Sequence, residues 1–356
     1  MSTSRRVALT ALVPLCLAGC AGVPRTQALA RDVAPSMQPV DIRVGVKQPE
    51  LYAAFDPSKA GAGAAAACGA VPGIGILLAA ACGGALGAVD ASVNAARAKD
   101  AEALVRPLKN ELVDIRFDQE MTEALRRSLL SVPGLQLAGT NLTKDVDDKS
   151  YMATYRASEA GAVMYINVDY HMSIDFSTLE VSARGMLFPR SANARKAAKL
   201  VADLPPADGK LTTTDSAYRM DVVYQARLPA QAGATPAAFI DAWKADGGRL
   251  IRGSLEDGIA HVSRALAEDL QRNPAEAAAV LRKVKPVAGD IEGDLLAEQD
   301  GGQLVRFPDG TLHYFTPAVA LAAPAPAVAT PATADVAPAM PAPPAAAPVT
   351  AGTGLQ

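Results

Sequence analysis

Between Met164 and Phe176 every second residue is apolar, and this stretch constrains the fold more than any other part of the sequence. The residues in between are mostly polar and include Asn167, Asp169 and His171. Alternation with a period of two is typical of a β-strand that has one buried face and one face in water. The chain therefore needs a sheet that is covered on one side.

Other alternating stretches extend this sheet. Residues 177–187 and 217–228 repeat the pattern of apolar and polar positions. Because the three stretches follow one another along the chain, we expect antiparallel pairing, with a polar and partly helical connection over 190–214. Two shorter strands are expected earlier, at 40–46 and 133–139.

The segments between and after these strands have helical periodicity. Helices are expected over 90–106, 118–131, 150–160 and 249–271. Pro107 should end the first of them, and Asp118 should cap the second. The last helix carries Ile251, Leu255 and Ile259 on one face, so it is an amphipathic cover for the sheet.

Two regions follow the last helix. Residues 286–316 have two glycine-containing turns between alternating runs, which predicts a small three-stranded β-meander. Residues 317–356 contain nine prolines and one charge, so we expect a disordered Pro/Ala-rich tail. The predicted fold class is α+β, with a mostly antiparallel sheet covered by helices over 40–285 and an Ala/Gly-rich apolar hairpin insertion at 60–89.

The insertion is thirty residues long and carries no charge, so its length alone would allow it to cross a bilayer. Its composition argues against a span, since twelve residues are Ala, eight are Gly and only seven are Val, Ile or Leu. In a straight helix, Cys68 and Cys82 would lie about 21 Å apart, beyond the reach of a disulfide. A hairpin that turns between Pro72 and Ile76 would bring them together as a disulfide in an oxidising compartment.

The alternative for these two cysteines is a pair of buried free thiols. The surface that the hairpin contacts also stays open. Packing on the body, lying on a membrane and self-association all fit its composition.

The N-terminus has the features of an export signal. Arg5 and Arg6 precede an apolar stretch, 7–17, that is too short to span a bilayer. The sequence Leu17-Ala18-Gly19-Cys20 then resembles the lipobox of bacterial lipoproteins. The resemblance implies that residues 1–19 are a signal peptide and that Cys20 is the lipidated first residue of the mature chain. The alternatives are an ordinary secretory signal and, because of the two arginines, export by the twin-arginine route.

The same resemblance implies a location. Ala21 stands after the lipidated cysteine where an aspartate would retain the protein in the inner membrane, so we expect the periplasmic face of the outer membrane. Outer-membrane lipid is then the partner of the acylated Cys20. Residues 20–39 show no sustained period and contain three prolines, so we expect a tether that holds the body up to about 60 Å from the membrane.

The order of the expected elements over about 40–272 carries a second resemblance. It is similar to the periplasmic fold shared by the TolB N-terminal domain, the curli-secretion lipoprotein and penicillin-binding-protein activator lipoproteins. The likeness rests on element order and on the lipobox, with no fixed residue motif. The insertion at 60–89 departs from that pattern.

Few residues suggest chemistry. Without residues 1–19 the chain has 32 basic and 37 acidic residues, a balance that argues against binding nucleic acid. The three histidines, His171, His261 and His313, lack the spacing of metal ligands, and no nucleophile motif or phosphate-binding loop is found. His171 beside Asp169 is a candidate pair, but a solvated pair is the simpler interpretation. We therefore expect no catalytic residue, metal or cofactor.

These patterns favour a non-enzymatic envelope protein that acts as an assembly or accessory factor by binding an envelope protein or a second copy of itself. One alternative is a subunit of an oligomeric export or pore apparatus in which the hairpin at 60–89 enters the membrane. A further alternative is a periplasmic hydrolase with an unrecognised site.

Overall fold

The computed structural model of the chain describes residues 25–55, 87–229, 233–272, 280–286, 291–299 and 301–317. All of them belong to one compact unit, Met1–Ala320. The expected tail beyond residue 317, the lipobox, and both Cys68 and Cys82 lie outside the described residues.

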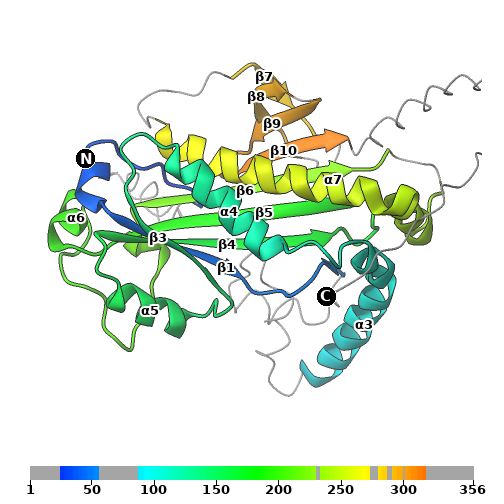
Figure 1. Cartoon of the computed structure of the whole chain (residues 1–356), viewed down its shortest axis with the longest axis horizontal. Coiled ribbons are helices and arrows are strands. Elements are labelled where there is room, and N and C mark those ends of the chain that lie inside the picture. Colours follow the sequence, from blue (N-terminus) through cyan, green and yellow to red (C-terminus); the bar gives the residue numbers. More distant parts are fainter. Residues whose placement is uncertain are drawn as a thin grey trace, which may run out of the picture. The chain divides into compact units, whose positions relative to one another are not determined.

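Ten strands form a single mixed sheet with the order β3-β1-β4-β5-β6-β10-β9-β8-β7, and β2 pairs with β4 off this path (Figure 1). Four strand pairs are parallel and five are antiparallel, which confirms the predicted α+β class with a mostly antiparallel sheet. The strands are β1 (Val40–Val46), β2 (Tyr52–Ala53), β3 (Leu137–Thr143), β4 (Ala162–Met172), β5 (Thr178–Pro189), β6 (Tyr218–Arg227), β7 (Arg282–Val284), β8 (Gly293–Gln299), β9 (Gly302–Arg306) and β10 (Leu312–Pro317).

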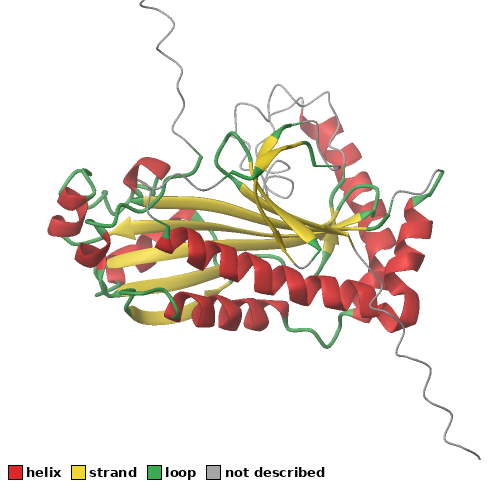
Figure 2. Cartoon of the chain, turned by 90° about the horizontal axis from the view of Figure 1, so that it is seen from above, coloured by secondary structure: helices red, strands yellow, loops and turns green. Residues whose placement is uncertain are grey.

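Helices cover both faces of this sheet to different extents. Two long helices, α4 and α7, run along one face (Figures 1 and 2), and we call this side the helix face. The shorter α5 packs on part of the opposite face. The helices are η1 (Ala34–Met37), α3 (Gly87–Glu111), α4 (Phe117–Leu130), α5 (Asp148–Ala157), α6 (Ala192–Ala197), η3 (Thr213–Asp215) and α7 (Pro236–Gln271).

The apolar periods place the main core where the sequence predicts it. Met164 and Ile166 of β4 are buried under the helix face, together with Met121, Leu125 and Leu129 of α4. A residue every four positions lines one side of a helix, and every second residue lines one side of a strand. The buried side of β4 and the buried side of α4 therefore pack against each other in one core.

Several expected boundaries are wrong. Helix α3 continues through Pro107 to Glu111, and its first residues, 87–89, belong to the stretch expected as the hairpin insertion. Helix α4 begins at Phe117 with no side-chain cap, so Asp118 lies in the first turn instead of at the cap. The last helix does start near the expected residue 249, because non-helical backbone at Ala245–Gly248 separates it from a shorter helical piece of α7 that begins at Pro236.

The expectation of one fully wet face on β4 is also wrong. Val163 and Tyr165 point away from the helix face but are buried against Met152 and Tyr155 of α5 and Phe188 of β5. The second core exists because α5 follows β3 and crosses to the opposite side of the sheet. Only the second half of β4 carries polar residues on this side, namely Asn167, Asp169 and His171.

The expected tether over 20–39 is corrected for residues 25–39, which pack on the body. Leu29, Val33 and Met37 belong to the main core, and Met37 is fully buried. These three residues are spaced four apart, so the segment carries a short apolar period that favours packing.

The expected meander forms, and it is part of the main sheet. Strand β10 pairs in parallel with β6, and β9, β8 and a further strand, β7, follow in antiparallel order. Among the described residues, no helix has the length and apolar character needed to cross a membrane.

Candidate functional site

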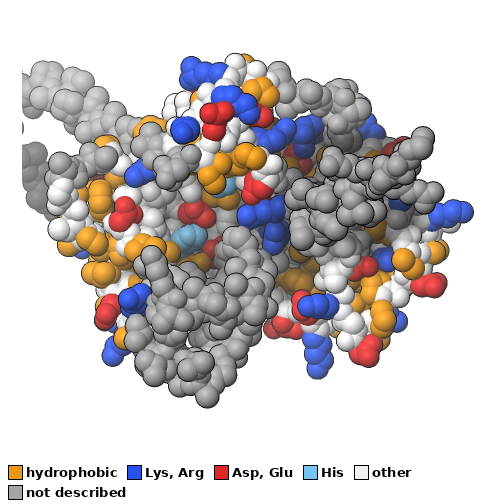
Figure 3. All heavy atoms as spheres, turned by 180° about the vertical axis from the view of Figure 1, so that it is seen from behind, with side chains coloured by type: hydrophobic (Ala, Val, Ile, Leu, Met, Phe, Trp, Pro, Cys, Tyr) orange, Lys and Arg blue, Asp and Glu red, His pale blue; other side chains and the backbone are white. Residues whose placement is uncertain are grey.

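The side of the sheet opposite the helix face carries polar residues in rows across β4, β5 and β6. One row contains Asn167, Arg184 and Asp221, which are register partners. The row four residues further along each strand contains His171, Glu180 and Gln225. We call these six residues, with Asp169 between the two rows, the polar face. Seen from behind, histidine, acidic and basic side chains gather on this side of the molecule (Figure 3).

One cluster on the polar face centres on Asp169. Its Oδ2 accepts a hydrogen bond from the Tyr52 hydroxyl at 2.7 Å and lies 3.2 Å from Nδ1 of His171. Nε2 of His171 lies 3.9 Å from a Glu180 oxygen, and the other Glu180 oxygen accepts from Gln225 at 2.8 Å. The Tyr52 ring stacks on the imidazole. Strand β2 supplies Tyr52, and the β4–β5 hairpin supplies the acids and the imidazole.

The charge on His171 follows from these neighbours. Burial alone would lower the pKa of His171, but the hydrogen bond to Asp169 and the charge of Glu180 outweigh burial and raise it. Burial and Asp169 also raise the pKa of Tyr52, so this phenol stays protonated as a donor. Both imidazole nitrogens face carboxylates, which is the arrangement of an ion pair. A general base needs a nitrogen directed at the group that it deprotonates.

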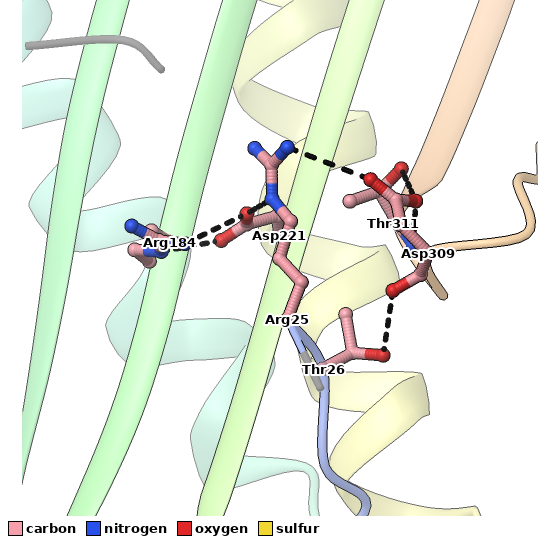
Figure 4. A network of polar contacts seen from close by, with 6 residues as sticks. All are labelled: Arg25, Thr26, Arg184, Asp221, Asp309 and Thr311. Carbon is pink, nitrogen blue, oxygen red and sulfur yellow. Dashed lines mark hydrogen bonds and ion pairs between the residues drawn. The ribbon is translucent and has the colours of Figure 1, made fainter. Parts of the chain in front are cut away.

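A second network holds the N-terminal segment on the polar face. Arg25 donates through Nε to Asp221 at 2.5 Å, and its Nη1 lies 3.5 Å from an Asp309 oxygen. Arg184 donates to the same Asp221 at 2.8 Å, so two guanidinium groups share one nearly buried carboxylate. Figure 4 shows these side chains on one side of the strands, with helices behind the strands.

The residues next to Arg25 strengthen this docking. Gln27 exchanges two backbone hydrogen bonds with Arg219, at 2.8 and 2.9 Å. The Thr26 hydroxyl donates to the Asp309 carbonyl at 3.3 Å. Gly310 has a φ of +88°, and a Cβ there would meet Thr26 Oγ1 at 1.9 Å, so only glycine fits this turn against the segment.

The helix face carries a groove between α4 and α7 with a volume of about 760 Å³. Small or apolar side chains (Ala124, Ile259 and Ala260) line it, together with charged and polar ones. The polar lining consists of Gln119, Glu120, Glu123, Arg127, Ser128, Glu256, Ser263 and Arg264. Such a groove, apolar within and charged at its borders, is suited to a polypeptide segment such as a helix.

The histidines singled out in the sequence are not brought together. His171 lies in the Asp169 cluster, while His261 of α7 stacks on Tyr314 with ring centroids 3.9 Å apart. His313 packs beside Phe307 and Phe315, and burial lowers its pKa to about 4, so it is neutral at pH 7. Within the described parts of the chain, no group of His, Cys, Asp and Glu has the geometry of a metal site.

Sequence reasoning missed the docking network. Asp221 and Arg184 occupy polar positions of predicted strands, but nothing in the strand pattern selects Arg25 as their partner. The available signals were the apolar spacing after Arg25 and the Pro-Asp-Gly turn at 308–310. The predicted lipidation site, Cys20, and the disulfide candidates, Cys68 and Cys82, lie outside the described residues.

No protein-family model matches the sequence, and no curated protein matches it either.

Proposed function

We propose that this chain is a lipid-anchored protein on the periplasmic face of the outer membrane, and that it binds an envelope protein through the groove between α4 and α7. It acts as an assembly or accessory factor and performs no catalysis. The groove is the observation that carries this proposal, because its size and its mixture of apolar and charged lining residues suit a polypeptide ligand.

The groove favours a partner of a particular chemistry. Its apolar lining consists of Ala124, Ile259 and Ala260, so a helix with apolar residues on one side fits against it. Glu120, Glu123 and Arg127 stand on the α4 side, and Glu256 and Arg264 stand on the α7 side. Charges of both signs on each border favour a partner helix that carries complementary charges and so fix its register.

The polar face supports the non-enzymatic part of the proposal. Its imidazole is held between two carboxylates, and its nearly buried carboxylate, Asp221, is occupied by Arg25 and Arg184. These contacts stabilise the sheet and the docked segment.

The anchor is tested by a Cys20→Ser substitution in the full-length chain. The lipobox Leu17-Ala18-Gly19-Cys20 predicts that this variant is no longer lipidated and leaves the outer-membrane fraction. Normal processing and unchanged fractionation of the variant would contradict the proposed location. Intact-mass measurement with and without reductant reports lipidation and the Cys68–Cys82 disulfide in the same sample.

The groove is tested by site-specific photocrosslinking in intact cells. Arg127 lines the groove, whereas its neighbour Arg126 is an exposed residue of the same helix outside the groove. A photoreactive residue at position 127 should yield one discrete crosslinked species, and position 126 should yield none. Adding Ala260→Arg, which places a large charged side chain in the groove, should abolish the product. Equal crosslinking from both positions, or none from either, contradicts the proposal.

A further inference from the structure

The docked N-terminal segment fixes where the chain enters the folded body. Arg25 is held by Asp221 of β6 and by Asp309 in the turn before β10, on the side of the sheet opposite the helix face (Figure 4). The chain then runs past Arg219 and buries Leu29 and Val33 in the core. The segment is therefore bound to the body from Arg25 onward.

The distance to the anchor is consequently short. Five residue steps separate Cys20 from Arg25, and a fully extended chain covers about 3.3–3.6 Å per residue, so the two Cα atoms lie within roughly 18 Å of each other. A tether over the whole of 20–39 would have allowed about 60 Å. Given the lipid anchor of the proposed function, on which this inference rests, the body lies against the bilayer.

The short reach also selects the side that faces the membrane. The helices α4 and α7, each about 10 Å thick, lie on the other side of the sheet from the Arg25 side chain (Figure 4). To bring the outer surface of α4 and α7 to the bilayer, the five residues would have to pass around the sheet edge and cross both layers. The surface around Arg25 needs no such detour, so it is the side that the short segment brings to the bilayer.

We propose that the surface around Arg25 and the turn 307–310 faces the bilayer and contacts phospholipid head groups, which directs the α4/α7 groove into the periplasm. The exposed Asp309 and the half-exposed Arg25 present one charge of each sign there. Head groups that carry a phosphate and an ammonium group offer the complementary pair. Phe307, His313 and Phe315 form an aromatic cluster beside them.

The orientation is tested with the lipidated full-length chain in vesicles of phosphatidylethanolamine and phosphatidylglycerol that contain a head-group nitroxide lipid. A fluorescent amino acid replaces either Pro308, exposed in the turn, or Arg126, exposed on the helix face. Quenching by the nitroxide lipid should be several-fold stronger at 308 than at 126. Equal quenching at both positions, or stronger quenching at 126, overturns the orientation.

Two further variants test whether the orientation depends on the short reach from the anchor and on the docking of Arg25. Inserting twenty Gly/Ser residues between Pro24 and Arg25 keeps the anchor and the docking but lengthens the reach, so the difference between 308 and 126 should disappear. Asp221→Asn weakens the hold on Arg25 and should reduce that difference. Flotation of the same vesicles reports the anchor independently. A wild-type chain that does not float overturns the anchor and this inference together, whereas a floating chain with equal quenching overturns the orientation alone.

Discussion

At the scale of single residues, the fold depends on a few contacts that join segments far apart in the sequence. Asp221 is shared by Arg25 and Arg184, and Gly310 admits Thr26 at a distance that no side chain would allow. Each contact connects the N-terminal segment to the sheet. Their loss should therefore loosen that segment before it affects the strands.

Gly310→Ala tests this dependence. The backbone there has φ +88°, and the new Cβ would collide with Thr26, so we expect a loss of about 2–3 kcal/mol of stability. Gly301→Ala is the matched control, because its φ is +76° but nothing described lies within 4 Å of its Cβ. Urea unfolding should show the larger loss for Gly310→Ala, and limited proteolysis should cut near residue 25 in this variant only. Equal losses would show that the contact with Thr26 is unimportant.

The stability that His171 provides should depend on pH. Its folded-state pKa is raised by Asp169 and Glu180 against the opposing effect of burial, so protonation favours the folded state. The contribution is fully present below the unfolded pKa of about 6.5 and is lost as the pH rises through the folded pKa. His171→Gln should therefore cost about 1–2 kcal/mol in urea unfolding at pH 5.5, the order of a hydrogen bond to a charged group, and less at pH 9. A cost that is the same at both pH values would argue against the charged pair.

At the scale of elements, the apolar periods predicted single strands and helices, but they did not predict contacts between segments far apart in the sequence. The period-two runs identified β4, β5 and β6, and the period of α4 identified its buried side. The parallel pairing of β10 with β6 escaped prediction because about ninety residues separate the two strands in the sequence, and register partners at that distance leave no local pattern. The packing of α5 on Val163 was not predicted, for the same reason.

Two leucines of α4 test whether the helical period identifies the buried side of this helix. Leu125 is fully buried in the core, whereas Leu130 is 52% exposed at the end of the same helix. Leu125→Ala should cost about 2–4 kcal/mol through lost burial and the cavity left behind. Leu130→Ala should change the free energy of unfolding by less than about 0.5 kcal/mol. Denaturant unfolding of both variants is the measurement, and a similar cost for the two would contradict the assigned buried side.

At the scale of the whole molecule, the two ends of the chain were expected to be alike, and the structure corrects this expectation for the N-terminal end. Both contain repeated prolines, and the sequence predicted a tether at one end and a tail at the other. Residues 25–39 instead contribute Leu29, Val33 and Met37 to the core, because three apolar side chains at a helical spacing suffice to pack beside η1. The contacts of Arg25 with Asp221 escaped prediction for this reason, because a tether is expected to make no contacts with the sheet.

Two truncations test whether the segment from Arg25 to Met37 is part of the core or only a tether. Starting the chain at Gln38 removes three core side chains and the partner of Asp221, which leaves a cavity in the core and a nearly buried carboxylate with one guanidinium fewer. Each lost core side chain costs on the order of 1–3 kcal/mol, so this deletion should lower the melting temperature by well over 10 °C or prevent folding. Ending the chain at Ala320 removes only the separate unit Leu321–Gln356 and should change the melting temperature by less than about 2 °C. If both deletions were harmless, the segment from Arg25 to Met37 would be a tether after all, and the close approach to the membrane inferred from its docking would have no basis.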